Sequence, residues 1–139
     1  MRQDLSDSTS LDPRPRVMVV DDDGVLAGAA SMLLVSLGYR VKTHTEPKAA
    51  LAELESDAGS YDALLTDYAM PSLSGIELAR RAAAVRPGLA IVLVTGYDRG
   101  PCEQCATIDA VLRKPYRLAE LERVMSSALE QRQVGSVAE

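Results

Sequence analysis

The chain has 139 residues, 47% of them hydrophobic, which is enough for one globular domain with a closed apolar core. Its 20 acidic and 15 basic residues give a formal net charge of -5, and it lacks a basic stripe of the kind that binds nucleic-acid phosphates, so we expect no direct nucleic-acid partner. No apolar run approaches the length of about 20 residues that spans a bilayer, and the N-terminal stretch MRQDLSDSTS lacks the apolar segment of a signal peptide. We therefore expect a cytoplasmic protein without membrane insertion.

Residues 1–15 are rich in Ser, Asp, Pro and Arg without periodicity, which predicts a flexible leader. Five short apolar or alternating segments follow, each typical of a β-strand, and they begin at Val17, Tyr39, Ala63, Ala90 and Ala110. The second alternates in polarity, as an edge strand with one solvated face does. Between and after the segments, apolar residues recur at helical spacing, at 25–38, 50–54, 76–83 and 118–129.

Local signals mark several ends of these helices. Gly38 ends the first one, and Ser74 with Glu77 forms the pattern of a capping box before the third. The connection 96–109 has room for about two helical turns, so its helix is expected to be short or irregular. Residues 132–139 are expected to form a C-terminal tail.

Strands and helices alternate along residues 16–131, and this predicts an α/β domain. In such a domain a doubly wound, five-stranded parallel sheet carries helices on both faces. The carboxyl ends of parallel strands meet at one edge of the sheet, where ligands bind. Five polar residues follow strand ends, and we expect them to share one crevice: Asp21, Asp22, Asp67, Thr95 and Lys114.

Three carboxylates in one crevice repel one another unless a cation lies between them. Oxygen ligands of this kind suit Mg²⁺ or Mn²⁺, so we predict a divalent metal site. Asp67 can act as a nucleophile toward a phosphoryl group, because the metal and Lys114 offset the charge and Thr95 donates a hydrogen bond.

Four motifs resemble the receiver domain of two-component response regulators at matching spacing: VVDDD, LLTDYAMPSLSGIEL, IVLVTGY and LRKPYRLAELERVM. The resemblance implies a flavodoxin-like strand order 2-1-3-4-5 and a phosphorelay function. Asp67 is then the phosphoacceptor, and the donor is the phosphohistidine of a sensor histidine kinase or a histidine phosphotransfer protein. The phosphorylated state is then signalled to a downstream protein, whose identity the sequence does not give. Homodimerisation stays open.

The resemblance also implies a ligand set for the metal. Asp22 binds it directly with Asp67, Asp21 binds it mainly through water, and the backbone carbonyl of Ala69 completes the protein's share.

Further roles follow from the same resemblance. A cis peptide at Pro115 aims Lys114, and Thr95 is the switch hydroxyl. The segments TGY and RKPYR are similar to receivers attached to hybrid sensor kinases.

Structural alternatives remain for single residues. Asp22 or Asp23 can cap the first helix, and Asp67 can be a turn residue. The lone His44 is expected to face solvent at the end of an edge strand, away from the crevice. Arg80 and Arg81 are expected on a solvated helix face.

Cys102 and Cys105 form a C-x-x-C pair without the second pair that a zinc site needs. We expect reduced thiols on a helix, while a redox pair or a metal site between subunits stays open.

The chain departs from the family at its output side. Val111 occupies the position where receivers commonly carry an aromatic switch residue, and the connection before it is short. Ala69 and Tyr97 flank the path of the hydrolytic water, and neither offers a carboxylate or amide to orient that water. The phosphoryl group is therefore expected to be long-lived.

Two other functions stay open at this stage. One is an interaction module with this fold that works without phosphorylation. The other is a small Mg²⁺-dependent phosphatase that forms an aspartyl-phosphate, but it would need a second carboxylate at position 69. We favour a phosphoacceptor signalling domain over an enzyme.

Overall fold

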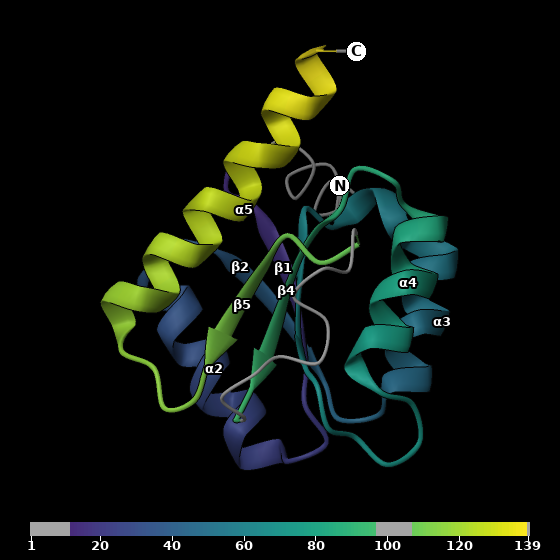
Figure 1. Ribbon diagram of the computed structural model, residues 1–139, viewed down its shortest axis with the longest axis vertical. Helices are drawn as coiled ribbons and strands as arrows, with labels where there is room; N and C mark the ends of the chain where they lie inside the picture. Colours follow the sequence, from purple (N-terminus) through teal and green to yellow (C-terminus); the bar gives the residue numbers. More distant parts are fainter. Residues whose placement is uncertain (1–11, 97–106, 139) are drawn as a thin grey trace, which may run out of the picture.

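The computed structural model describes residues 12–96 and 107–138. Its sheet contains five strands, β1 (Arg16–Val20), β2 (Arg40–His44), β3 (Ala63–Asp67), β4 (Ala90–Thr95) and β5 (Ala110–Arg113). All neighbouring strands are parallel, and their order is β2-β1-β3-β4-β5 (Figure 1). The predicted fold class and strand order are confirmed.

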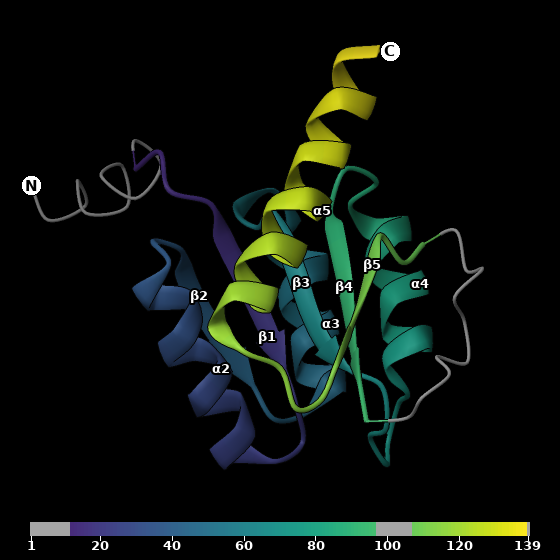
Figure 2. The same cartoon turned by 60° about the vertical axis from the view of Figure 1, so that its left-hand side comes forward.

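Helices cover both faces of this sheet. They are α2 (Gly24–Ser36), α3 (Pro47–Asp57), α4 (Gly75–Val85) and α5 (Leu118–Ala138), with a 3₁₀ turn at Ala58–Ser60. Figures 1 and 2 show α2 and α5 on one face and α3 and α4 on the other. Two apolar cores result, one under each helix pair, centred on Leu34 and Met125 and on Leu54 and Leu78. Among the described residues, no helix combines the length and apolarity needed to cross a bilayer.

The three central strands are buried because helices pack on both of their faces. Every residue of β3 and β4 is buried; β4 is apolar up to its last residue, Thr95, and β3 is apolar up to Thr66 and Asp67. Strand β2 lies at an edge, as predicted, but its exposed residues Lys42 and Thr43 are consecutive and so lie on opposite faces, where a single solvated face was expected.

Capping residues fix where the helices begin and end. The Asp23 carboxylate accepts hydrogen bonds from the backbone N–H groups of Val25 and Leu26, so Asp23 is the N-cap of α2. Gly38 follows α2 with φ of 100°, a value that favours glycine. The Ser74 hydroxyl accepts from the Glu77 N–H at 3.2 Å, which confirms the predicted start of α4.

Ordered structure extends beyond both predicted ends of the domain, residues 16 and 131. The backbone of Pro15 accepts a hydrogen bond from the Arg40 N–H, so the end of the expected leader joins the edge strand. The segment expected as a tail begins inside α5, whose backbone continues to Ala138. Whether the connection between β4 and β5 holds a helix depends on 97–106, which lie outside the described residues.

Candidate functional site

Four strand ends bring the predicted polar residues to one edge of the sheet. Asp21 and Asp22 follow β1, Asp67 and Thr95 end β3 and β4, and Lys114 follows β5. Adjacent strands place them together because β3 lies between β1 and β4, with Asp67 in register with Val94. The convergence predicted from the sequence is therefore found in the fold.

The three carboxylates form a tight cluster. Asp21, Asp22 and Asp67 each offer one oxygen, and these oxygens lie within 4.8 Å of one another. Asp21 and Asp67 are both 8% exposed, whereas Asp22 is exposed to solvent. Clustered carboxylates open to water on one side form a donor set that fits a hydrated divalent cation such as Mg²⁺.

The electrostatics of Asp21 favour a cation at this place. Burial raises the pKa of Asp21, and the charges of Asp67 and Asp22 raise it further. A hydrogen bond from the Asp23 backbone N–H and the charge of Lys114 offset only part of this effect. Negative charge in the cluster is thus incompletely balanced by the protein itself.

The three consecutive aspartates, residues 21–23, have different structural roles. Asp23 points its carboxylate at the start of α2 and caps it, while Asp21 and Asp22 belong to the cluster. Of the two candidates for the N-cap, the structure therefore selects Asp23.

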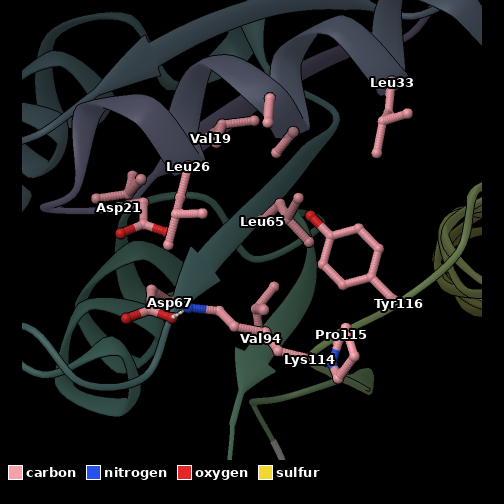
Figure 3. Close-up of a pocket in the computed structure, with 13 residues that line it drawn as sticks. Val19, Asp21, Leu26, Leu33, Leu65, Asp67, Val94, Lys114, Pro115 and Tyr116 are labelled. Carbon is pink, nitrogen blue, oxygen red and sulfur yellow. Dashed lines mark ion pairs between the residues drawn. The ribbon is translucent and has the colours of Figure 1, made fainter.

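Lys114, which follows β5, contacts the Asp67 carboxylate of the cluster. Its Nζ lies 2.8 Å from Oδ1 of Asp67, and the two form an ion pair (Figure 3). Burial by itself lowers the pKa of Lys114, but the hydrogen bond and charge of Asp67, together with Asp21, raise it above its ordinary value. The peptide between Lys114 and Pro115 is cis, as the resemblance implied.

A small cavity opens beside the acceptor carboxylate. It measures about 340 Å³ and is lined by Asp67, Tyr68, Ala69, Thr95, Gly96 and Lys114. Ala69 is exposed and Thr95 is almost fully buried, at 1%. Ala69 and Thr95, both predicted to belong to the site, therefore line one cavity with Asp67. This cavity is large enough for a phosphoryl group.

A second, apolar cavity of about 380 Å³ extends from the cluster under α2 (Figure 3). Leu26 and Leu33 from α2, Leu65 from the sheet and Tyr116 line it, and its polar end is formed by Asp21, Asp67 and Lys114. Burial raises the pKa of Tyr116. Sequence reasoning missed this cavity and the role of Tyr116 in lining it, because the space depends on how α2 packs on the sheet and no local pattern encodes that.

His44 does not face solvent, and that expectation was wrong. Its side chain is 15% exposed, and Nε2 lies 2.7 Å from Oε1 of Glu53 on α3. Glu53 also accepts a hydrogen bond from the hydroxyl of buried Tyr61 and pairs with Lys42. Burial alone raises the pKa of Glu53, but the hydrogen bonds from Tyr61 and His44 and the charge of Lys42 lower it to about 2.

Other predicted residues lie apart from the cluster. Arg80 and Arg81 are exposed on α4 and pair with Glu77, which confirms a solvated helix face. Val111 is half-buried on β5 opposite Leu93. Tyr97, Cys102 and Cys105 lie outside the described residues.

Comparisons with known proteins give the same family as the sequence motifs. A model of the response regulator receiver domain matches residues 17–126. The response regulator receiver protein CpdR of Brucella abortus is 32% identical over 109 residues, which cover 76% of this chain and 89% of CpdR. The chain spans 54% of the response regulator MprA of Mycobacterium bovis, at 33% identity, and 20% of a two-component response regulator of Arabidopsis thaliana.

Solved structures agree at the level of the fold. A response regulator receiver domain protein from Clostridium thermocellum superposes with a TM-score of 0.80 at 24% identity, covering 86% of this chain and 98% of that one. The response regulator TrrA from Thermotoga maritima, solved in complex with Mg²⁺ and BeF, has a TM-score of 0.74 at 26% identity, covering 82% and 98%. The family model covers residues 17–126, and the motifs, the sheet order and the acidic cluster agree with it. This chain therefore belongs to the response regulator receiver domains of two-component signal transduction.

Proposed function

We propose that Asp67 accepts a phosphoryl group from a phosphohistidine donor with the help of a divalent metal. The observation that carries the proposal is the position of Asp67, between the carboxylates of Asp21 and Asp22 and the ammonium of Lys114. The carboxylates on one side of Asp67 can hold a metal cation, and Lys114 on the other side is itself a cation. The negative charge of an incoming phosphoryl group is therefore offset on both sides.

Asp21, Asp22, Asp67 and the backbone carbonyl of Ala69 would hold Mg²⁺ or Mn²⁺. The metal would supply charge neutralisation between the carboxylate and the phosphoryl oxygens. Burial raises the pKa of Asp21, and the negative charges of Asp67 and Asp22 raise it further; a cation bound among the three carboxylates would offset these charges.

In the proposed transfer, a carboxylate oxygen of Asp67 attacks phosphorus and the phosphorus–nitrogen bond of the donor breaks. The imidazole leaves with the bonding electron pair and takes up a proton. Lys114 moves its hydrogen bond from Asp67 to a phosphoryl oxygen, and the Thr95 hydroxyl donates to another oxygen of the group. The cavity of about 340 Å³ beside Asp67 gives a phosphoryl group room next to this carboxylate.

We infer that a sensor histidine kinase or a histidine phosphotransfer protein is the donor, and that the domain works in the cytoplasm. Output then runs through contacts with a downstream protein. Valine at position 111 lacks the size of an aromatic ring and has few rotamers, so we infer that the output signal does not depend on rotation of this side chain. A phosphatase is not favoured, because Ala69 stands where its second carboxylate is needed.

The proposal is tested by incubation with acetyl phosphate, with and without Mg²⁺, followed by intact-mass spectrometry. One added phosphoryl group (about 80 Da) is expected, only with metal present. Asp67→Asn is expected to abolish the addition, while the matched variant Asp23→Ala keeps it, because Asp23 caps α2 and lies outside the cluster. Addition to Asp67→Asn, or addition without metal, would contradict the proposal.

A further inference from the structure

The residue before the acceptor, Thr66, is a polar side chain in a fully buried position. It is 0% exposed on β3, where it follows the buried Leu65 and precedes Asp67. Its hydroxyl donates a hydrogen bond to the backbone carbonyl oxygen of Asp67, with 3.1 Å between the two oxygens. A buried hydroxyl is costly unless it is bonded, and here its bond is to the acceptor residue itself.

The Asp67 carbonyl lies where the pairing of β3 with β1 stops, while pairing with β4 continues through Asp67. Strand β1 pairs with β3 only as far as Val20, which is opposite Thr66. The peptide that joins Asp67 to Tyr68 is thus one step beyond the register with β1, and on the β4 side its N–H donates to the Val94 carbonyl at 2.8 Å. The Thr66 hydroxyl supplies a donor at the point where the ladder with β1 ends.

The same carbonyl is held from its other side by the start of α4. A Cβ added at Gly75 would lie inside van der Waals contact with the Asp67 carbonyl oxygen, and 3.0 Å from Cδ1 of Leu93. The Gly75 N–H also donates to the Tyr68 carbonyl at 2.9 Å. Only glycine allows this close approach, so the peptide after Asp67 has little room to turn.

We propose that Thr66 is a positioning residue for the phosphoacceptor. By fixing the peptide between Asp67 and Tyr68, its hydroxyl keeps the Asp67 carboxylate aimed at Lys114. It also restrains Ala69, two residues further along, which lines the cavity beside Asp67. This inference rests on the proposed role of Asp67 and adds a residue that contacts neither metal nor phosphoryl group.

The experiment compares Thr66→Val, which keeps the shape but loses the hydroxyl, with Thr66→Ser, which keeps the hydroxyl but loses a methyl group. Leu64→Val is the matched control, because Leu64 is buried two residues earlier on the same face of β3. Circular dichroism first establishes conditions in which every variant is folded. The readouts are the rate of phosphorylation by acetyl phosphate and the Mg²⁺ dissociation constant from NMR titration.

For Thr66→Val we expect phosphorylation to be about tenfold slower at saturating Mg²⁺, equivalent to about 1.4 kcal/mol of transition-state stabilisation. Its Mg²⁺ affinity should fall by up to about tenfold. Thr66→Ser and Leu64→Val should stay within about twofold of wild type in both readouts, although both lose buried apolar volume and stability.

A purely structural role predicts a different order. If folded Thr66→Val matches wild type in both readouts, or if Thr66→Ser loses as much as Thr66→Val, the positioning role is refuted. If wild type itself takes up no phosphoryl group, the proposed function fails instead, and the Mg²⁺ titration of the same variants still decides the positioning role.

Discussion

Replacing Glu53 with glutamine removes one charge and keeps the shape of the side chain. In the folded protein this charge accepts hydrogen bonds from His44 at 2.7 Å and from Tyr61, and it pairs with Lys42 at 3.4 Å. The network bears on the site, because the His44 carbonyl accepts the backbone N–H of Asp21 at 3.1 Å. We expect Glu53→Gln to destabilise the domain and to loosen the end of β2 next to the acidic cluster.

The magnitude follows from the pKa of Glu53. Its pKa falls from an ordinary value of 4.5 to about 2 on folding, which corresponds to at most about 3–4 kcal/mol of stability. The side chain is 21% exposed, so solvent screening reduces this figure, and we expect about 2 kcal/mol near neutral pH. Because the folded pKa is the lower one, this contribution is complete above about pH 5 and is lost as the pH falls toward 2.

Urea unfolding of wild type and Glu53→Gln at about pH 7 and about pH 3 measures this difference. The gap in unfolding free energy should be about 2 kcal/mol at the higher pH and less than half of that at the lower one. Glu55→Gln, an exposed position on the same helix, serves as the control and should change stability little at either pH. A gap that is absent at neutral pH, or that grows on acidification, would refute the reasoning.

Three further predictions concern the site, the last helix and the phosphorylated state. Asp22→Ala should weaken Mg²⁺ binding severely while Asp23→Ala leaves it nearly unchanged; equal losses by calorimetric titration would mean that the triplet is wrongly divided. Arg132→Gln should lower the unfolding free energy by about 1–2 kcal/mol, because the Arg132 guanidinium binds both carboxylate oxygens of Asp109, and a change below about 0.5 kcal/mol in urea would argue against this. The aspartyl-phosphate should decay slowly, and Tyr97→Ala should speed its loss by admitting water; unchanged decay, followed by mass spectrometry, would count against shielding.

Local patterns in the sequence were sufficient for most of the fold. The buried strands β3 and β4 are short apolar runs, and Gly38 and Ser74 mark helix ends through their own backbone or side-chain chemistry. The gathering of Asp67 and Lys114 was also predictable, because parallel strands place their carboxyl ends at one edge.

Features that depend on packing between distant segments were not predictable in this way. His44 pairs with Glu53, nine residues away on the next helix, and a single polar residue at a strand end carries no signal for that contact. Thr66 fits a strand pattern equally well with or without a bonded hydroxyl, and the need for glycine at position 75 appears only once α4 packs on β3. The cavity under α2 likewise arises from the fit of a helix to the sheet.

The central claim is that Asp67 carries the phosphoryl group, and locating that group tests it most directly. After incubation with acetyl phosphate and Mg²⁺, borohydride reduces an aspartyl-phosphate to homoserine, which peptide mass spectrometry can assign to one position. The account predicts homoserine at position 67, in wild type and in Asp23→Ala, and only when metal is present during phosphorylation. Homoserine at position 21 or 22, or unmodified Asp67 in protein that has gained a phosphoryl group, would contradict it.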